Sequence, residues 1–213
     1  MQLANLKLIS ICAYLTETDT KWRTEDHRAL KMVKAIKGDP INGYFSSPVG
    51  GKWRRYDQSN VHEFVDRVPR ALATNILRHH DAAATIVPIP NSHVTSTTTA
   101  GFNTLELAQK IAQHSGGKFT VSPALVFNEV QKKSREGGPR DASHFETAYR
   151  VTQFVKGPII LLDDVCTGGG HLIAAYRRLH GKDSPVMLAC TFGRSTKEQF
   201  ENPVGLRQEE LDV

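Results

Sequence analysis

The chain has 213 residues, a formal net charge of +5 at pH 7, 39% hydrophobic residues and 23% charged residues. This length suits one domain with an elaboration or two small domains, and the composition excludes a low-complexity or disordered chain. No run approaches the roughly 18 apolar residues that a membrane-spanning helix needs, and the first residues lack the features of a signal peptide, so we expect a cytoplasmic protein. The mild positive charge favours an anionic ligand, phosphate as readily as nucleic acid. Three cysteines stand singly and offer neither a paired metal spacing nor a disulfide framework: Cys12, Cys166 and Cys190.

The first predicted elements are a strand and a helix. Residues 8–15 form a short apolar run that is typical of a strand. Thr24 is suited to cap a helix in which Leu30 and Ile36 recur at helical spacing, and Gly38 ends it.

The next segment is rich in turn residues and aromatic residues. Residues 38–60 contain Gly, Pro and Ser beside Tyr, Phe and Trp, which predicts a long loop or hairpin. A second helical stretch covers residues 61–80, and Pro69 must either kink it or open a new helix.

From residue 84 onward, strands alternate with helices. The continuous apolar run 159–162 is typical of a strand buried on both faces. Alternation across residues 84–192 predicts the α/β class, with a parallel sheet that carries helices on both faces. We expect strands over 85–89, 124–127, 159–162 and 185–191, and helices over 102–114, 142–149 and 172–179. We divide the chain into an N-terminal hood or elaboration (1–80), a core (81–194) and a polar, peripheral C-terminal tail (195–213).

The stretch IILLDDVCTGGGHL, residues 159–172, carries the clearest chemistry. Ligands of open α/β sheets bind beyond the carboxyl ends of the strands. Glycines 168–170 let backbone N–H groups converge, and the following helix adds its positive N-terminus, which makes a cradle for phosphate. Ionised Asp163 and Asp164 only accept hydrogen bonds, so they suit paired hydroxyl donors such as a ribose diol. Phosphate beside a diol describes a ribose 5-phosphate site.

Other motifs fail on single residues. A dinucleotide-binding G-x-G-x-x-G would need glycine where Ile173 stands, and a P-loop sequence is absent. His62 and Glu63 do not begin a zinc-protease motif, because residue 66 is Asp. A helix-capping Asp followed by a glycine turn stays open as the structural alternative.

The same stretch resembles the ribose-phosphate signature of type I phosphoribosyltransferases, in which hydrophobic residues precede an acidic pair and a Gly/Thr loop. The resemblance implies that the acidic pair binds the ribose of phosphoribosyl pyrophosphate (PRPP), with Asp164 also catalytic, and that the loop binds the 5-phosphate. The family usually ends this loop in Thr, where this chain has His171, although imidazole also donates to phosphate. The implied PRPP-binding residues are Asp163, Asp164, Val165, Cys166, Thr167, Gly168, Gly169, Gly170 and His171.

Further segments resemble the competence-protein-F (ComF-type) branch of that family. They are VPIPNSH (87–93), AGFNTLELAQKIA (100–112) and the short basic helix KMVKAIKG (31–38). Two departures stand beside the resemblance. The paired-cysteine zinc motif of the branch is absent, and TSTTTA (95–100) replaces its arginines, which removes expected pyrophosphate ligands.

The resemblance also implies where pyrophosphate and metal bind. The turn Pro90, Asn91, Ser92 and His93 would bind pyrophosphate through backbone N–H groups, and an ordinary turn is the alternative. A mobile loop would close over PRPP and supply catalytic Lys132, Lys133 and Arg135 to the leaving pyrophosphate, although a solvated linker fits equally. Mg²⁺ is the implied cofactor, held indirectly by Asp163 and Asp164 through ribose hydroxyls or water.

We therefore expect transfer of a phosphoribosyl group to a nitrogenous base or related small-molecule acceptor, with release of pyrophosphate. The alternative is a non-catalytic protein of the same fold that senses PRPP or a nucleotide, or associates with nucleic acid. A homodimer is left open. The aromatic and basic residues of 44–56 either cover a base, since bases stack on aromatic faces, or pack as a satellite cluster on the core.

Overall fold

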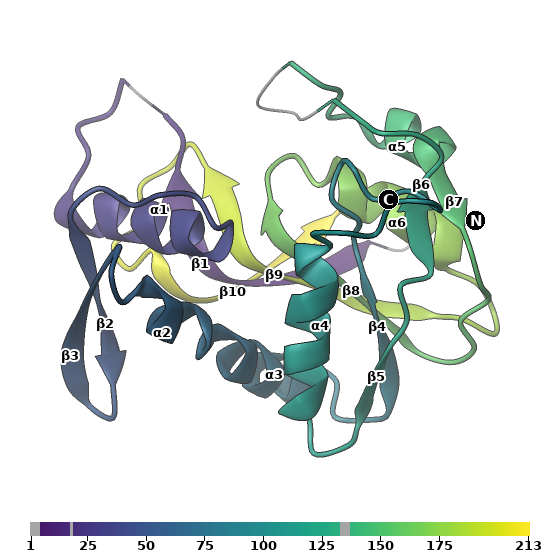
Figure 1. Ribbon diagram of the computed structural model, residues 1–213, viewed down its shortest axis with the longest axis horizontal. Helices are drawn as coiled ribbons and strands as arrows, with labels where there is room; N and C mark the ends of the chain where they lie inside the picture. The colour runs from purple at the N-terminus through teal and green to yellow at the C-terminus, as the bar shows by residue number, and fades with distance from the viewer. Residues whose placement is uncertain (1–4, 18, 133–136) are drawn as a thin grey trace.

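The computed structural model describes residues 5–17, 19–132 and 137–213. Its centre is a six-stranded sheet in the order β10-β1-β9-β8-β4-β5 (Figure 1). All neighbouring pairs are parallel except β10 with β1, so the predicted α/β class with a mostly parallel sheet is confirmed. The strands are β1 (Leu6–Leu15), β4 (Ala84–Pro88), β5 (Phe119–Val121), β8 (Ile159–Cys166), β9 (Val186–Thr196) and β10 (Val204–Leu211).

Helices cover both faces of this sheet. The apolar cluster on one face contains residues of α1 to α4, and the cluster on the other face contains residues of α5 and α6. β8 contributes side chains to both clusters: Ile160 and Leu162 belong to the first, and Ile159 and Leu161 to the second. This two-sided burial explains the continuous apolar run in its sequence. The helices are α1 (Thr24–Ile36), α2 (Val61–Val65), α3 (Val68–His79), α4 (Asn103–Gln113), α5 (Ala142–Ala148) and α6 (Gly170–Leu179).

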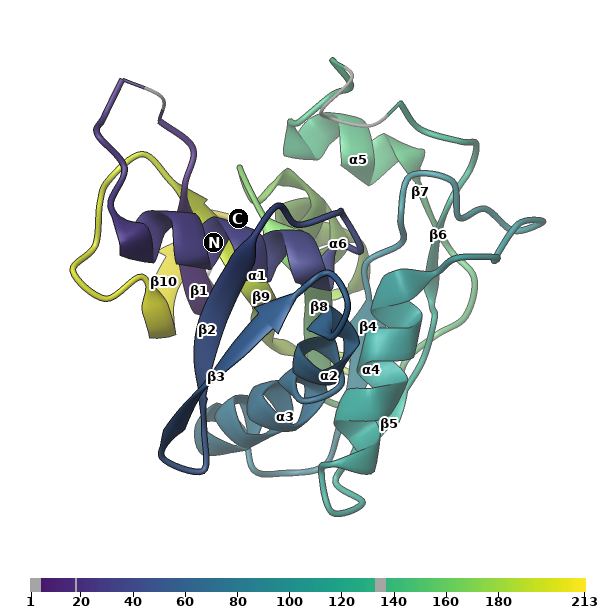
Figure 2. The ribbon, with the colours of Figure 1, turned by 60° about the vertical axis from the view of Figure 1, so that its left-hand side comes forward.

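Two small antiparallel sheets flank the centre. β2 (Tyr44–Val49) and β3 (Lys52–Asp57) form a hairpin beside α1 and α2 (Figure 2), within the segment that we predicted as a loop or hairpin. Its cross-strand pair Phe45 and Tyr56 is buried in the core. β6 (Leu125–Phe127) pairs with β7 (Tyr149–Val151) on the side of α5.

Several boundaries differ from the prediction. The helical stretch 61–80 is two helices, because Pro69 stands in the first turn of α3, where its missing N–H costs nothing. Arg23, not Thr24, is the cap of α1. Residues 204–211, which we placed in a polar tail, form β10. Their alternation of exposed and less exposed residues is that of a strand with one face in water, so composition alone suggested a tail.

The central sheet also crosses the predicted division of the chain. β1, from the predicted N-terminal elaboration, lies between β9 and β10. The three-part division itself stays a prediction. None of the described helices is both long and apolar enough to span a bilayer.

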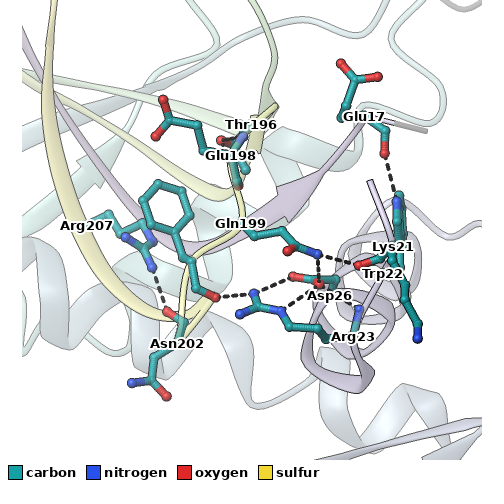
Figure 3. A network of polar contacts seen from close by, with 11 residues as sticks. Glu17, Lys21, Trp22, Arg23, Asp26, Thr196, Glu198, Gln199, Asn202 and Arg207 are labelled. Atoms are coloured by element: carbon teal, nitrogen blue, oxygen red, sulfur yellow. Dashed lines mark hydrogen bonds and ion pairs between the residues drawn. The ribbon is translucent and has the colours of Figure 1, made fainter. Parts of the chain in front are cut away.

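A polar network joins the loops that follow β1 and β9 (Figure 3). Arg23 forms an ion pair with buried Asp26, at 3.0 Å, and also donates to the carbonyl of Phe200. Gln199 donates to Asp26 at 2.9 Å and to the carbonyl of Lys21 at 2.8 Å. The Arg23 hydrogen bond keeps the pKa of Asp26 below its usual value, so the carboxylate stays ionised. The network fixes the start of α1 against the loop that follows β9.

Candidate functional site

The candidate site lies where the chain connections diverge. β4 continues through α4 to β5 on one side, and β8 continues through α6 to β9 on the other. Ligands of open α/β sheets bind outside the carboxyl ends of strands at such a switch point. A cleft of about 320 Å³ lies there. It is lined by Lys37, Asp39, Ile89, Pro90, Asn91, Ser92, His93, Asn103, Asp163, Asp164, Val165, Thr167 and His171. The predicted acidic pair and the predicted pyrophosphate turn therefore face one space.

The glycine loop has the backbone geometry of a tight strand-to-helix turn. Gly169 is the N-cap of α6 and has φ +82°, a value that favours glycine. A Cβ on Gly170 would overlap the carbonyl oxygen of Arg140 and lie 3.1 Å from its carbonyl carbon. Gly168 is exposed with open space around its Cα. A small cavity of about 30 Å³ lies between the loop and the N-terminus of α6, and it is lined by Thr167, Gly169, Gly170 and Arg140.

The acidic pair lies on β8, which continues past the predicted end at residue 162. It does so because Asp163 pairs with Thr191 and Cys166 with Arg194 along β9. The backbone N–H of Asp164 donates to Asp163 Oδ1 at 2.8 Å. Burial raises the pKa of Asp163, and the neighbouring Asp164 raises it further. Burial also raises the pKa of Asp164, while nearby Lys37 opposes that shift. Such a pair gains most from a ligand that brings hydroxyl donors or a cation.

His171 stands where the resembled family has Thr, and the structure gives it a fixed orientation. Its ring centroid lies 3.7 Å from that of Phe145, and its Nδ1 lies 2.8 Å from the hydroxyl of Tyr149. Burial lowers the pKa of His171 to about 4, so the imidazole is neutral at neutral pH. Burial raises the pKa of Tyr149, so its phenol is protonated and can donate to Nδ1. In the tautomer with its proton on Nε2, which this contact allows, His171 can donate a hydrogen bond to a ligand.

The turn after β4 is braced from three sides. The backbone N–H of Asn103 donates to Asn91 Oδ1 at 3.0 Å. His93 Nε2 lies 3.0 Å from the carbonyl of Ala100, and the N–H of Gln131 donates to the carbonyl of Ser92 at 2.7 Å. The turn is therefore held in place by α4 and by the segment that follows β6.

The predicted catalytic loop is described only in part. Lys132 is exposed and does not line the cleft. Lys133 and Arg135 lie outside the described residues. The catalytic assignment of these three side chains stays a prediction.

Sequence reasoning missed three polar or charged residues that line the cleft, Lys37, Asp39 and Asn103, and the apolar Ile89. Lys37 and Asp39 follow α1, and Asn103 begins α4. The signal for Lys37 was the basic stretch KMVKAIKG (31–38), which we noted only as a family resemblance.

Sequence reasoning also missed a set of contacts that supports the glycine loop, the clamp formed by Arg194 and Glu209. Arg194 of β9 forms a bidentate ion pair with Glu209 of β10, at 2.6 and 3.1 Å. The same guanidinium donates to the carbonyl of Thr167 and to Cys166 Sγ, the latter at 3.5 Å. Burial raises the pKa of Cys166 to about 11, which suits a packing residue and not a nucleophile. The strand that we took for a tail thus supports the loop.

Comparisons with known proteins give only weak similarities. The chain matches no protein-family model and no curated protein. Among solved structures it is similar to UMP synthase from Leishmania donovani, at 12% identity over 79% of this chain and 32% of the other, with a TM-score of 0.39. It is also similar to orotate phosphoribosyltransferase from Aeropyrum pernix, at 17% identity over 78% and 83% of the two chains, with a TM-score of 0.37. Adenine phosphoribosyltransferase from Leishmania donovani gives 13% identity, 92% of both chains and a TM-score of 0.36.

The chain spans about a third of the length of that UMP synthase. At such low identity and TM-score, the functional assignment has to rest on the residues of the cleft.

Proposed function

We propose that the protein is a phosphoribosyltransferase-like enzyme that binds PRPP with Mg²⁺, transfers its phosphoribosyl group to a nitrogenous acceptor and releases pyrophosphate. One observation carries the proposal. An acidic pair and a glycine loop at the carboxyl end of β8 face a braced turn after β4 across one cleft. The glycine loop would suit the phosphate, the acidic pair the diol, and the turn after β4 the pyrophosphate.

The glycine loop would hold the 5-phosphate. The first N–H groups of α6 have no partner within the helix, and the dipole of the helix favours an anion at that end. His171, in the tautomer with its proton on Nε2, would add a neutral donor close by. Asp163 and Asp164 would accept hydrogen bonds from the ribose hydroxyls.

In this proposal, catalysis relies on positioning and charge stabilisation. Ribosyl transfer passes through an oxocarbenium-like centre, so the enzyme needs no nucleophile of its own. A rigid grip on the phosphate and the diol fixes C1 against the acceptor, and hydrogen-bond donors at the turn after β4 would stabilise the leaving pyrophosphate.

Magnesium fits the chemistry of the acidic pair, because Mg²⁺ prefers oxygen ligands and keeps several waters. The described residues contain no group of three or more His, Cys, Asp or Glu side chains placed to hold a metal ion. We therefore propose that Asp163 and Asp164 hold Mg²⁺ indirectly, through ribose hydroxyls or water. When bound, the ion would balance the charge of pyrophosphate.

Calorimetric titration with PRPP and Mg²⁺ tests the proposal. We expect binding, and we expect the double change Asp163→Asn and Asp164→Asn to weaken it strongly, since an amide oxygen is a weaker acceptor than a carboxylate and the amide NH2 places a donor where the hydroxyls need an acceptor. Glu146→Gln, a carboxylate on α5 that does not line the cleft, is the control. No binding of PRPP at millimolar concentration would refute the proposal.

A second candidate function is supported by the β2–β3 hairpin. Trp53 and Tyr44 are 65% and 50% exposed, unusually high values for aromatic side chains. Arg28 lies 5.2 Å above the Trp53 ring, and Arg55 lies 3.8 Å above the Tyr44 ring. Exposed aromatic faces beside cations bind single-stranded nucleic acid by stacking and charge, which fits a non-catalytic, nucleic-acid-associated protein.

Fluorescence anisotropy with a labelled single-stranded oligonucleotide separates the two functions. The second candidate predicts binding that weakens with salt and is lost in Trp53→Ala. Release of pyrophosphate from PRPP with any nucleobase would exclude a purely non-catalytic role.

A further inference from the structure

The cleft contains an imbalance of charge that the proposed function has to resolve. Three carboxylates line it: Asp39, Asp163 and Asp164. Among the described residues that line it, Lys37 is the only lysine or arginine. Burial raises the pKa of Asp163 and Asp164, so this space already disfavours negative charge, and a pyrophosphate group that enters it is disfavoured for the same reason. A fixed cation is therefore valuable here.

Lys37 is carried on an anchored helix end. It is the C-cap of α1, and its backbone N–H donates to the carbonyl of Val33 at 3.1 Å. Val33 is buried against Gly193 of β9, where an added Cβ would lie 2.9 Å from its Cγ2. The other end of α1 is held by the Arg23–Asp26 network. The helix thus delivers the lysine to the cleft from the sheet face that carries α1 to α4.

We propose that Lys37 is a catalytic residue that binds the pyrophosphate group of PRPP and stabilises it as it leaves. This inference rests on the proposed phosphoribosyl transfer. In that step the C1–O bond of PRPP breaks and its electron pair goes to the pyrophosphate oxygen. A C1–N bond forms with the acceptor, whose displaced proton goes to solvent. Lys37 exchanges no proton and opposes the growing negative charge.

Two observations favour pyrophosphate over the other ligand groups. Lys37 does not line the small cavity at the glycine loop, where the 5-phosphate would lie. TSTTTA (95–100) lacks the arginines expected as pyrophosphate ligands, and Lys132 does not line the cleft. A lysine on α1 supplies the charge from another element.

The test compares three ligands by calorimetry: pyrophosphate with Mg²⁺, PRPP with Mg²⁺, and ribose 5-phosphate. Lys37→Ala should weaken binding of pyrophosphate and PRPP by roughly tenfold or more, as expected for losing a charge-assisted hydrogen bond. Binding of ribose 5-phosphate should change less than about twofold. Lys37→Met, which keeps the aliphatic stem, should behave like Lys37→Ala, and Lys37→Arg should recover part of the affinity.

Lys34→Ala is the matched control, because it removes the same charge from the last turn of α1 at a position that does not line the cleft. It should leave all three affinities unchanged. Equal pyrophosphate affinity in wild type and Lys37→Ala would overturn the inference. So would an equal loss for ribose 5-phosphate, which would mean that Lys37 acts on the acidic pair. If the wild-type protein binds neither PRPP nor pyrophosphate, the proposed function itself fails.

Discussion

The glycine loop offers a direct test of how the candidate phosphate cradle is built, because its three glycines have different surroundings. Gly170→Ala places a methyl group against the carbonyl of Arg140, 3.1 Å from its carbon and 3.2 Å from the carbonyl carbon of Asp141. These are backbone atoms at the start of α5, so relief requires the chain to move. Overpacking of this kind destabilises by about 1–3 kcal/mol, and each kcal/mol lowers the melting temperature of a chain of this size by about 2–4 °C.

Gly168→Ala is the control within the same loop, since a Cβ there meets nothing within 4 Å and Gly168 is not among the glycines of positive φ. Its free energy of unfolding should change by less than about 0.5 kcal/mol. Denaturant unfolding and calorimetry with ribose 5-phosphate give the two readouts. Gly170→Ala should lose stability and ligand affinity together. If Gly170→Ala is as stable as Gly168→Ala, the close approach of Arg140 does not constrain the loop and the reasoning is wrong.

Two further predictions concern groups that support the loop. The pKa of His171 is lowered to about 4 in the folded protein from an ordinary 6.5, so below pH 6.5 the unfolded chain binds a proton that the folded chain does not. Stability should fall as the pH decreases from about 6.5 to about 4, by up to about 3 kcal/mol, and denaturant unfolding at several pH values should show His171→Asn losing this dependence. An unchanged pH profile in that variant would contradict the buried neutral imidazole. Glu209→Gln should lower the free energy of unfolding by about 1–3 kcal/mol, because half-buried Arg194 loses its ionised partner. It should also weaken ribose 5-phosphate binding, although Glu209 itself would not contact the ligand. Asn5→Ala, which removes an exposed hydrogen bond to the neighbouring Glu210 and leaves the Arg194–Glu209 ion pair in place, is the control and should leave that affinity unchanged.

The sequence predicted features that depend on local chemistry. Burial of residues 159–162 followed from their apolar run, and the turn from strand to helix followed from the consecutive glycines. The extension of β8 to Cys166 did not follow, because carboxylates within a strand are explained only by their pairing with β9. A turn rich in Pro, Asn and Ser after β4 was also readable, although its bracing by Asn103 was not.

Features that depend on contacts between distant segments were not readable. Lys37 reaches the cleft because α1 packs on the face where β8 and β9 carry Leu162 and Phe192, and a basic helix gives no hint of that placement. The clamp of Arg194 and Glu209 requires β9 and β10 to lie on either side of β1. The sequence pattern of a half-exposed strand is the same whether or not its charged residues form ion pairs across the sheet.

The arrangement of charge separates two kinds of anion recognition. At the glycine loop, the small cavity is lined by Arg140, His171 and the first residues of α6, so a phosphate bound there would meet the fixed dipoles of backbone N–H groups. The larger cleft is lined by three acidic side chains and one lysine, so a second anion there needs added positive charge. In the proposed reaction, the first group stays bound throughout while the second departs. Fixed dipoles hold a charge that does not change, and a cation, Lys37 with Mg²⁺, is best placed where negative charge grows as the bond breaks. In the proposed reaction, this division would give the glycine loop the role of holding the ribose phosphate and Lys37 the role of promoting the departure of pyrophosphate.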